Sequence, residues 1–135
     1  MTAVADPQFD EDEFVERVRV RAGTPKGMAA QWRRYAASSR SMAQAEHHVG
    51  HLFAAELLVT RALVREAAAA LLMSQSPTDA AAEMMLHARR FSVRTPPLVD
   101  YDSAAIRYTQ ARSWQWCAHQ IDPSLPEVQA RWPEA

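Results

Sequence analysis

The chain has 135 residues, of which 48% are hydrophobic and 23% are charged. This composition excludes a disordered chain and favours one globular domain with a buried core. The formal net charge of −1 excludes a molecule-wide field that would attract nucleic acid or anionic lipid.

The remaining whole-chain features concern location. A single cysteine excludes an internal disulfide and suits a reducing compartment, and the first residues show no signal-peptide pattern. The most apolar stretch, 52–73, contains four charged residues, so we expect no membrane span. We therefore predict a cytoplasmic protein. Fourteen arginines against one lysine suggest a GC-rich bacterial genome.

The first elements in chain order are an arm and a short helix. Residues 1–9 contain little apolar surface and are predicted to form an acidic arm. A helix is expected to begin at Asp10 or Asp12 and to end at Gly23, because acids crowd its first turn and arginines its last. A second helix begins at Thr24, with proline in its first position.

The middle of the chain predicts one long helix. The serine cluster at 38–41 indicates a break, after which a helical pattern runs from Ser41 to about Gln75. Gly50 lies inside this pattern and costs a continuous helix about 1 kcal/mol relative to alanine.

The last third predicts two more helices and a tail. Ser76 and Pro77 favour a helix start, and that helix runs to about Phe91. Residues 92–102 read as an extended connector, and Asp102 as the cap of a helix over 103–120. In the proline-punctuated tail, 122–135, up to two helical turns are expected between Pro126 and Trp132. The chain is thus predicted to be an all-α bundle of four main helices, with short terminal helices and extended arms around a helical domain over 10–121.

Two histidine-containing pairs are candidates for metal ligands. His47 and His51 are spaced i, i+4 on one helix, as are Glu83 and His87 on the next. If those helices pack antiparallel, however, the two pairs lie roughly 20 Å or more apart along the axis. Solvated or partner-facing histidines are therefore favoured over a metal site, and no cofactor is predicted for this chain alone.

Glu56 is the least ordinary residue of the central helix. A helical wheel places its carboxylate within a stripe of leucine, valine and phenylalanine, on what we expect to be the core face. A buried carboxylate must be paired or hydrogen-bonded. An ion pair with an arginine of another helix, a subunit contact, and a general acid or base are the three interpretations.

Charge is distributed unevenly along the chain. Residues 1–16 contain six acidic and no basic residues, whereas residues 17–45 contain seven basic and no acidic ones. The basic segment is a candidate for contact with nucleic acid phosphates. Its arginines are Arg17, Arg19, Arg21, Arg33, Arg34 and Arg40.

Aromatic residues are concentrated in the last third. Trp114 and Trp116 are about 200° apart on a helix, so one of them needs a second apolar environment. A partner protein would provide it, or else the tail wraps back over Trp116 in the same chain. Because tryptophan, tyrosine and arginine dominate protein interfaces, a set of candidate partner-binding residues follows. These are Tyr101, Arg107, Tyr108, Arg112, Trp116 and Trp132.

The preferred functional hypothesis is a small helical interaction module. It either completes a larger catalytic subunit, for example an oxidoreductase, or self-associates, and it is a non-catalytic or co-catalytic chain rather than a self-sufficient enzyme. One alternative is a stand-alone metal-binding protein or enzyme that uses Glu56 or the His47/His51 and Glu83/His87 pairs. The other is a nucleic-acid binder that uses the basic segment.

Overall fold

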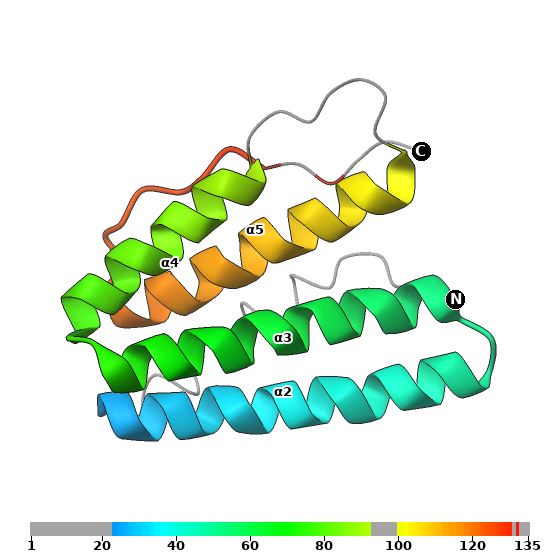
Figure 1. Ribbon diagram of the computed structural model, residues 1–135, viewed down its shortest axis with the longest axis horizontal. Coiled ribbons are helices and arrows are strands. Elements are labelled where there is room, and N and C mark those ends of the chain that lie inside the picture. Colours follow the sequence, from blue (N-terminus) through cyan, green and yellow to red (C-terminus); the bar gives the residue numbers. More distant parts are fainter. Residues whose placement is uncertain (1–22, 93–99, 131, 133–135) are drawn as a thin grey trace.

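The computed structural model describes residues 23–92, 100–130 and 132, and within these ranges the chain forms helices and no strand. Four helices follow in order: α2 (Pro25–His48), α3 (Leu52–Ser74), α4 (Pro77–Ser92) and α5 (Tyr101–Ile121). They pack lengthwise as a bundle (Figure 1). The prediction of an all-α bundle is confirmed. The arm over 1–9 and the helix expected from Asp10 lie outside the described residues.

The break between the first two helices does not fall where the sequence suggested. α2 begins as predicted, with Thr24 Oγ1 accepting a hydrogen bond from the Gly27 amide at 3.0 Å. It then continues through the serines at 38–41, because serine costs a helix only a few tenths of a kcal/mol and Ser39 is buried. The predicted continuous helix over 41–75 is wrong, since the chain reverses at Gly50, whose φ is +89°.

Small residues hold α2 and α3 close together. Buried alanines recur every seventh residue on both helices, and this spacing keeps them on one side of each helix. On α2 they are Ala29, Ala36 and Ala43, and on α3 they are Ala55, Ala62 and Ala69. Because alanine extends little from the backbone, the two antiparallel helices approach closely along most of their length (Figure 1).

α4 and α5 form the second antiparallel pair. Ser76 Oγ accepts from the Asp79 amide at 3.1 Å, so α4 begins at Pro77 as predicted. The expected cap at Asp102 is wrong: Asp100 caps α5, its carboxylate accepting from the Ser103 amide at 2.8 Å. α5 packs against both α4 and α3, and the six consecutive residues 113–118 are all buried. α5 is therefore the helix that joins the two pairs into one core.

The chain after α5 packs back along that helix without forming the helical turns expected between Pro126 and Trp132. Leu125 and Val128 pack against the core cluster. Among the described helices, none is both long and apolar enough to span a lipid bilayer.

Candidate interaction surfaces

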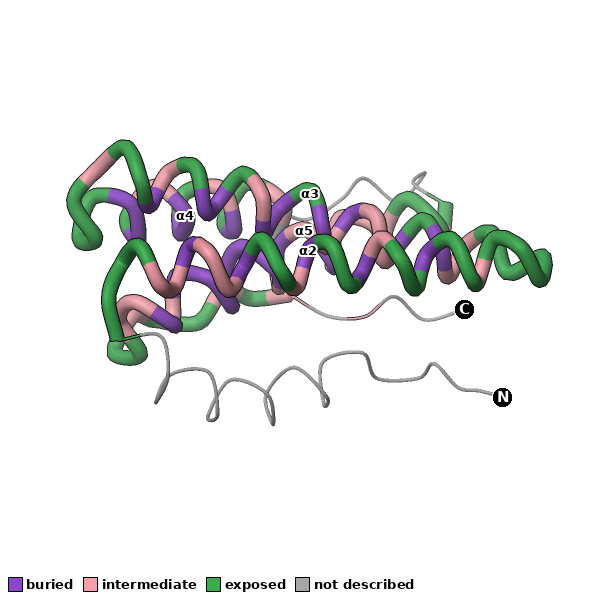
Figure 2. Tube along the Cα trace, turned by 90° about the horizontal axis from the view of Figure 1, so that it is seen from below, coloured by how far each residue is buried: buried purple, intermediate pink, exposed green. Residues whose placement is uncertain are grey.

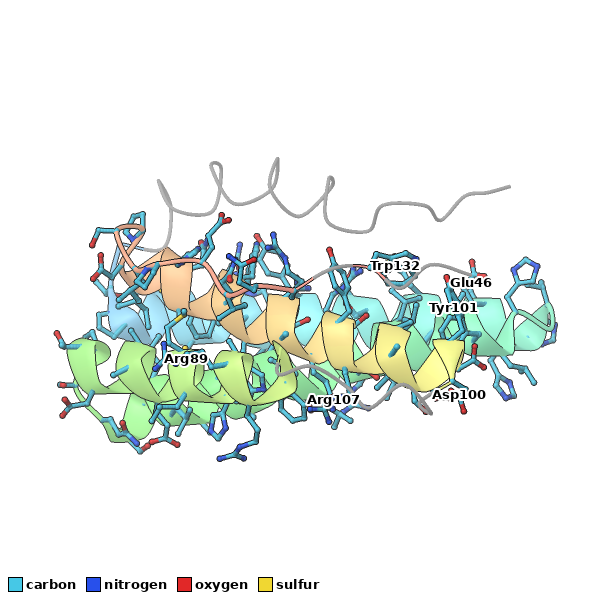
Figure 3. All side chains as sticks on the ribbon, turned by 90° about the horizontal axis from the view of Figure 1, so that it is seen from above. Glu46, Arg89, Asp100, Tyr101, Arg107 and Trp132 are labelled. Atoms are coloured by element: carbon cyan, nitrogen blue, oxygen red, sulfur yellow. The ribbon has the colours of Figure 1, made fainter. Side chains whose placement is uncertain are left out.

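Three of the predicted partner-binding residues come together at the start of α5. Tyr101 and Tyr108 are seven residues apart and share one side of the helix, where Trp132 of the tail lies against both. The Trp132 ring is 6.3 Å from the Tyr101 ring and 5.3 Å from the Tyr108 ring, in edge-to-face geometry. Its indole N–H donates to the Tyr101 hydroxyl at 3.0 Å (Figure 3). All three residues are half-buried, so this aromatic cluster still reaches the surface.

Trp116, by contrast, is buried within the chain, with 7% of its surface exposed. Its ring lies 6.4 Å from that of Trp32 and 6.1 Å from that of Tyr35, both on α2. Trp114 points to another side of α5 and stacks on His87 of α4 at 4.5 Å. Of the two environments expected for the second tryptophan, a partner or the same chain, the structure shows the second, because helices flank α5 on more than one side.

Arg65 of α3 is a core residue, although the sequence pattern grouped it with polar residues. It is 5% exposed, and its guanidinium lies 4.4 Å from the Trp116 ring centroid and 5.8 Å from that of Tyr35. A desolvated guanidinium over aromatic faces is stabilised by the ring quadrupoles. Arg65 lies on the same side of the helix as Ala68 and Leu72, and this shared side is the feature of the sequence that could have indicated its burial.

One predicted arginine of α5, Arg107, contacts the neighbouring helix α4. Arg107 lies 5.6 Å from the Phe91 ring centroid, and its Nη2 donates to the Arg90 carbonyl at 3.1 Å. Arg107 therefore ties α5 to the end of α4. Arg112 is half-buried.

Glu56 does not lie on the core face, and that expectation is wrong: its side chain is exposed. The apolar stripe around Glu56 is divided in the structure: Leu52 and Leu63 are 58% and 54% exposed, whereas Leu57 and Val64 are buried. The core side of α3 is instead formed by small residues, Leu57, Val64 and Arg65. The side of α3 that carries Leu52, Glu56 and Leu63 therefore points away from the core.

We define the outward face of α3 as the exposed residues that share this side of the helix. They are Leu52, Glu56, Leu63, Ala67 and Ala70. The set spans about 27 Å at 1.5 Å per residue. Glu56 is its one charged member. Figure 2 shows exposed and buried positions alternating along the helices of the bundle.

The histidine pairs lie in different surroundings. His47 is exposed, and His51 Nδ1 lies 2.7 Å from a Glu46 carboxylate oxygen. His87 Nε2 is 3.5 Å from one carboxylate oxygen of Glu83. The other oxygen accepts a hydrogen bond from the side-chain amide of Gln75 at 2.8 Å. In the part of the chain that the structure describes, no three potential metal-ligating side chains meet. The four predicted ligands are thus not brought together.

The basic segment is only partly described. Arg33 and Arg34 are exposed on α2, whereas Arg17, Arg19 and Arg21 lie outside the described residues. Arg40 forms a bidentate ion pair with Glu66 of α3, in which both hydrogen bonds are 2.8 Å long. Hydrogen bonding to Arg40 lowers the pKa of the Glu66 carboxyl, and the same bonds raise the pKa of Arg40. Arg40 is therefore engaged in holding α2 to α3.

Comparison of the chain with protein-family models, with curated proteins and with solved structures finds no match.

Proposed function

We propose that this chain is a helical protein-interaction module and that the outward face of α3 is its principal contact surface. The observation that supports the proposal is the exposure of Leu52 and Leu63 on one side of a helix, continued by Ala67 and Ala70. Apolar surface that is contiguous, rather than scattered, is typical of sites of protein contact.

Two other exposed apolar residues, Leu86 and Met42, do not form such a stripe. Leu86 on α4 is followed at helical spacing by the exposed Arg89 and Arg90. Met42 on α2 has serine at the positions three and four residues before it. Single exposed apolar side chains of this kind are normal on a soluble surface and need no partner.

The helix that carries the face is held rigidly. The heptad-spaced alanines fix α3 against α2, and the Arg65 guanidinium fixes it against Trp116 of α5. A surface on a preformed helix loses little conformational entropy on binding. Glu56, a charge within an apolar stripe, would favour partners with a basic group at that point and disfavour acidic ones.

The proposal is tested by purifying the tagged chain from its own host and comparing three versions. These are the unaltered chain, Leu63→Glu and Met42→Glu. Met42 is a matched control because it is an apolar residue that is 52% exposed but lies on α2, outside the outward face of α3. Circular dichroism and thermal unfolding establish that all three are folded.

A protein that copurifies is then made separately and titrated against the purified chains by calorimetry. We expect the unaltered chain and Met42→Glu to bind it with equal affinity. Leu63→Glu should bind it with an affinity lower by at least about tenfold. Equal binding by all three versions would contradict the assignment of this face, and the absence of any complex would contradict the module itself. The identity of the partner decides whether it is a catalytic subunit or a second copy.

A further inference from the structure

A row of basic residues runs along the edge of α2 that borders the outward face of α3. Its members recur every seventh residue and therefore lie on one side of the helix. They are Lys26, Arg33, Arg40 and His47, which we call the basic row. All are exposed except Arg40, which is half-buried, and α2 contains no acidic residue before Glu46.

The ion pair between Arg40 and Glu66 shows where this row lies. Nε and Nη2 of Arg40 donate to the two carboxylate oxygens of Glu66, both at 2.8 Å. Glu66 follows Leu63 by three residues and so borders the outward face of α3. Because Lys26 and Arg33 share the side of α2 that carries Arg40, the row follows this border along the two neighbouring helices (Figure 1).

The basic row and the outward face together form an apolar stripe with a cationic edge. Glu66 neutralises Arg40, so positive charge remains at the other positions of the row, and at His47 when it is protonated. Glu56 is the one acidic member of the outward face. The charges are thus arranged unevenly, and uneven charge beside an apolar contact selects the partner and its orientation.

The apolar stripe distinguishes this surface from one that binds nucleic acid phosphates. Phosphate backbones are met by cationic and polar groups. Leu52 and Leu63, which are 58% and 54% exposed, offer them nothing.

An amphipathic helix with an acidic flank is complementary to both parts of the surface. Its apolar face covers the stripe, and its acidic flank meets the basic row. The outward face is straight over about 27 Å, which is the length of a helix of about 18 residues. Glu56 requires one basic residue within that helix, at the end of the face that carries Leu52.

We propose that the outward face of α3 and the basic row together bind an amphipathic helix of a partner protein, and that the flank of this helix facing α2 is acidic. The inference rests on the function proposed above and adds the chemistry of the partner. The apolar stripe provides the contact area, and the basic row excludes helices with a basic flank.

The experiment uses two labelled synthetic peptides of about twenty residues that form amphipathic helices with a leucine face. One peptide carries glutamate along the flank of that face, and the other carries lysine at the same positions. Fluorescence anisotropy at low ionic strength measures their binding to the unaltered chain, Arg33→Glu, Arg34→Glu and Leu63→Glu. Circular dichroism and thermal unfolding establish that each variant is folded.

Arg34→Glu is the matched control for Arg33→Glu. It changes the net charge by the same amount, and Arg34 is also exposed on α2. Arg34 nevertheless lies outside the basic row, and its guanidinium donates to the Gln31 side chain at 2.7 Å. A difference between the two variants therefore reports the position of the charge and not its sum.

We expect the unaltered chain to bind the glutamate peptide at least about tenfold more tightly than the lysine peptide, and this preference to shrink as salt is added. Arg33→Glu should weaken binding of the glutamate peptide roughly tenfold, and Arg34→Glu by less than about threefold. Leu63→Glu should weaken the binding of both peptides, because it places a charge in the apolar stripe.

Three results would overturn the proposal: equal affinity for the two peptides, equal effects of Arg33→Glu and Arg34→Glu, or no binding of the glutamate peptide at millimolar concentration. Either of the first two, combined with weaker binding by Leu63→Glu, would leave the contact surface of the proposed function intact. Binding that is unaffected by Leu63→Glu would instead count against that surface itself.

Other occupants give distinct results, each of which would overturn the assignment to a partner helix. A DNA duplex of about twenty base pairs whose binding is lost in Arg33→Glu but unchanged in Leu63→Glu would assign the row to nucleic acid. A dimer in sedimentation that is lost in Leu63→Glu would assign the face to a second copy. A roughly tenfold gain in peptide affinity when Glu11, Asp12 and Glu13 are changed to their amides would assign the row to the chain's own acidic segment.

Discussion

The guanidinium of Arg65 on α3 lies 4.4 Å from the ring centroid of Trp116 on α5. The contact joins the two helix pairs, and it places a cation among buried aromatic side chains. The charge is stabilised there by the electron-rich faces of Trp116 and Tyr35.

Replacement of Arg65 should therefore destabilise the fold. We expect Arg65→Ala to lower the free energy of unfolding by about 2–4 kcal/mol, through loss of ring stacking and of packed side-chain volume. Arg65→Lys keeps the charge but not the planar group, and should still be destabilising. Urea denaturation measures both. As a control, exposed Arg33→Ala should change stability by less than about 0.5 kcal/mol, and an equal effect of the two alanine variants would contradict this role.

Gly50 should tolerate no ordinary side chain without loss of stability. Its φ of +89° lies in the region that L-residues avoid, and a Cβ added there meets no atom within 4 Å, so the cost is conformational. We expect Gly50→Ala to destabilise the chain by about 1–2 kcal/mol and Gly50→Asn by less. If residues 41–75 formed a continuous helix, the change in stability would have the opposite sign, and Gly50→Ala would stabilise the chain by about 1 kcal/mol. Thermal unfolding distinguishes the two.

The alanine contact between α2 and α3 should reject larger side chains. Ala36 is fully buried, whereas its neighbour Ala37 is exposed. We expect Ala36→Leu to cost about 1–3 kcal/mol, because the added volume forces the helices apart. Ala37→Leu should leave stability within about 0.5 kcal/mol of the unaltered chain. If both changes are tolerated equally in chemical denaturation, the close approach of these helices is refuted.

Stability should fall in acid partly through the pair between Arg40 and Glu66. Because the folded chain lowers the pKa of Glu66, the pair stabilises the fold above the carboxyl's unfolded pKa, and this contribution disappears as pH falls through the folded pKa. Asp100 and Asp122, whose pKa values are lowered by bonds from Ser103 and Ser124, act in the same direction.

Glu66→Gln isolates the first of these contributions. In urea denaturation, the stability difference between this variant and the unaltered chain should shrink from neutral pH to about pH 3. A difference that is independent of pH would show that the pair contributes nothing through ionisation.

The starts of helices were the most predictable part of the fold. Thr24 with Pro25, and Ser76 with Pro77, act through local hydrogen bonds and a fixed φ, so a few residues of sequence suffice. The reversal at Gly50 was not predictable in the same way. Glycine fits both a helix interior, at a cost, and a left-handed turn, and the tertiary packing of α2 on α3 decides between them.

The orientation of α3 was also beyond the reach of sequence periodicity. Apolar residues surround this helix, so a wheel correctly groups Glu56 with Leu52 and Leu63 but does not reveal which side faces the core. Alanines, Leu57, Val64 and Arg65 turn inward, whereas Leu52 and Leu63 turn outward. The clustering of Tyr101, Tyr108 and Trp132 depended on the path of the tail, although each residue had been identified as a candidate for contact.

The most direct test of the interaction surface is site-specific photo-crosslinking in the native host. A benzoylphenylalanine side chain replaces Leu63 in one version of the chain and Met42 in another, and the products are identified by mass spectrometry. The outward face of α3 predicts one discrete protein adduct from position 63 and none from position 42. The same adducts from both positions, or no adduct from position 63, would contradict the account.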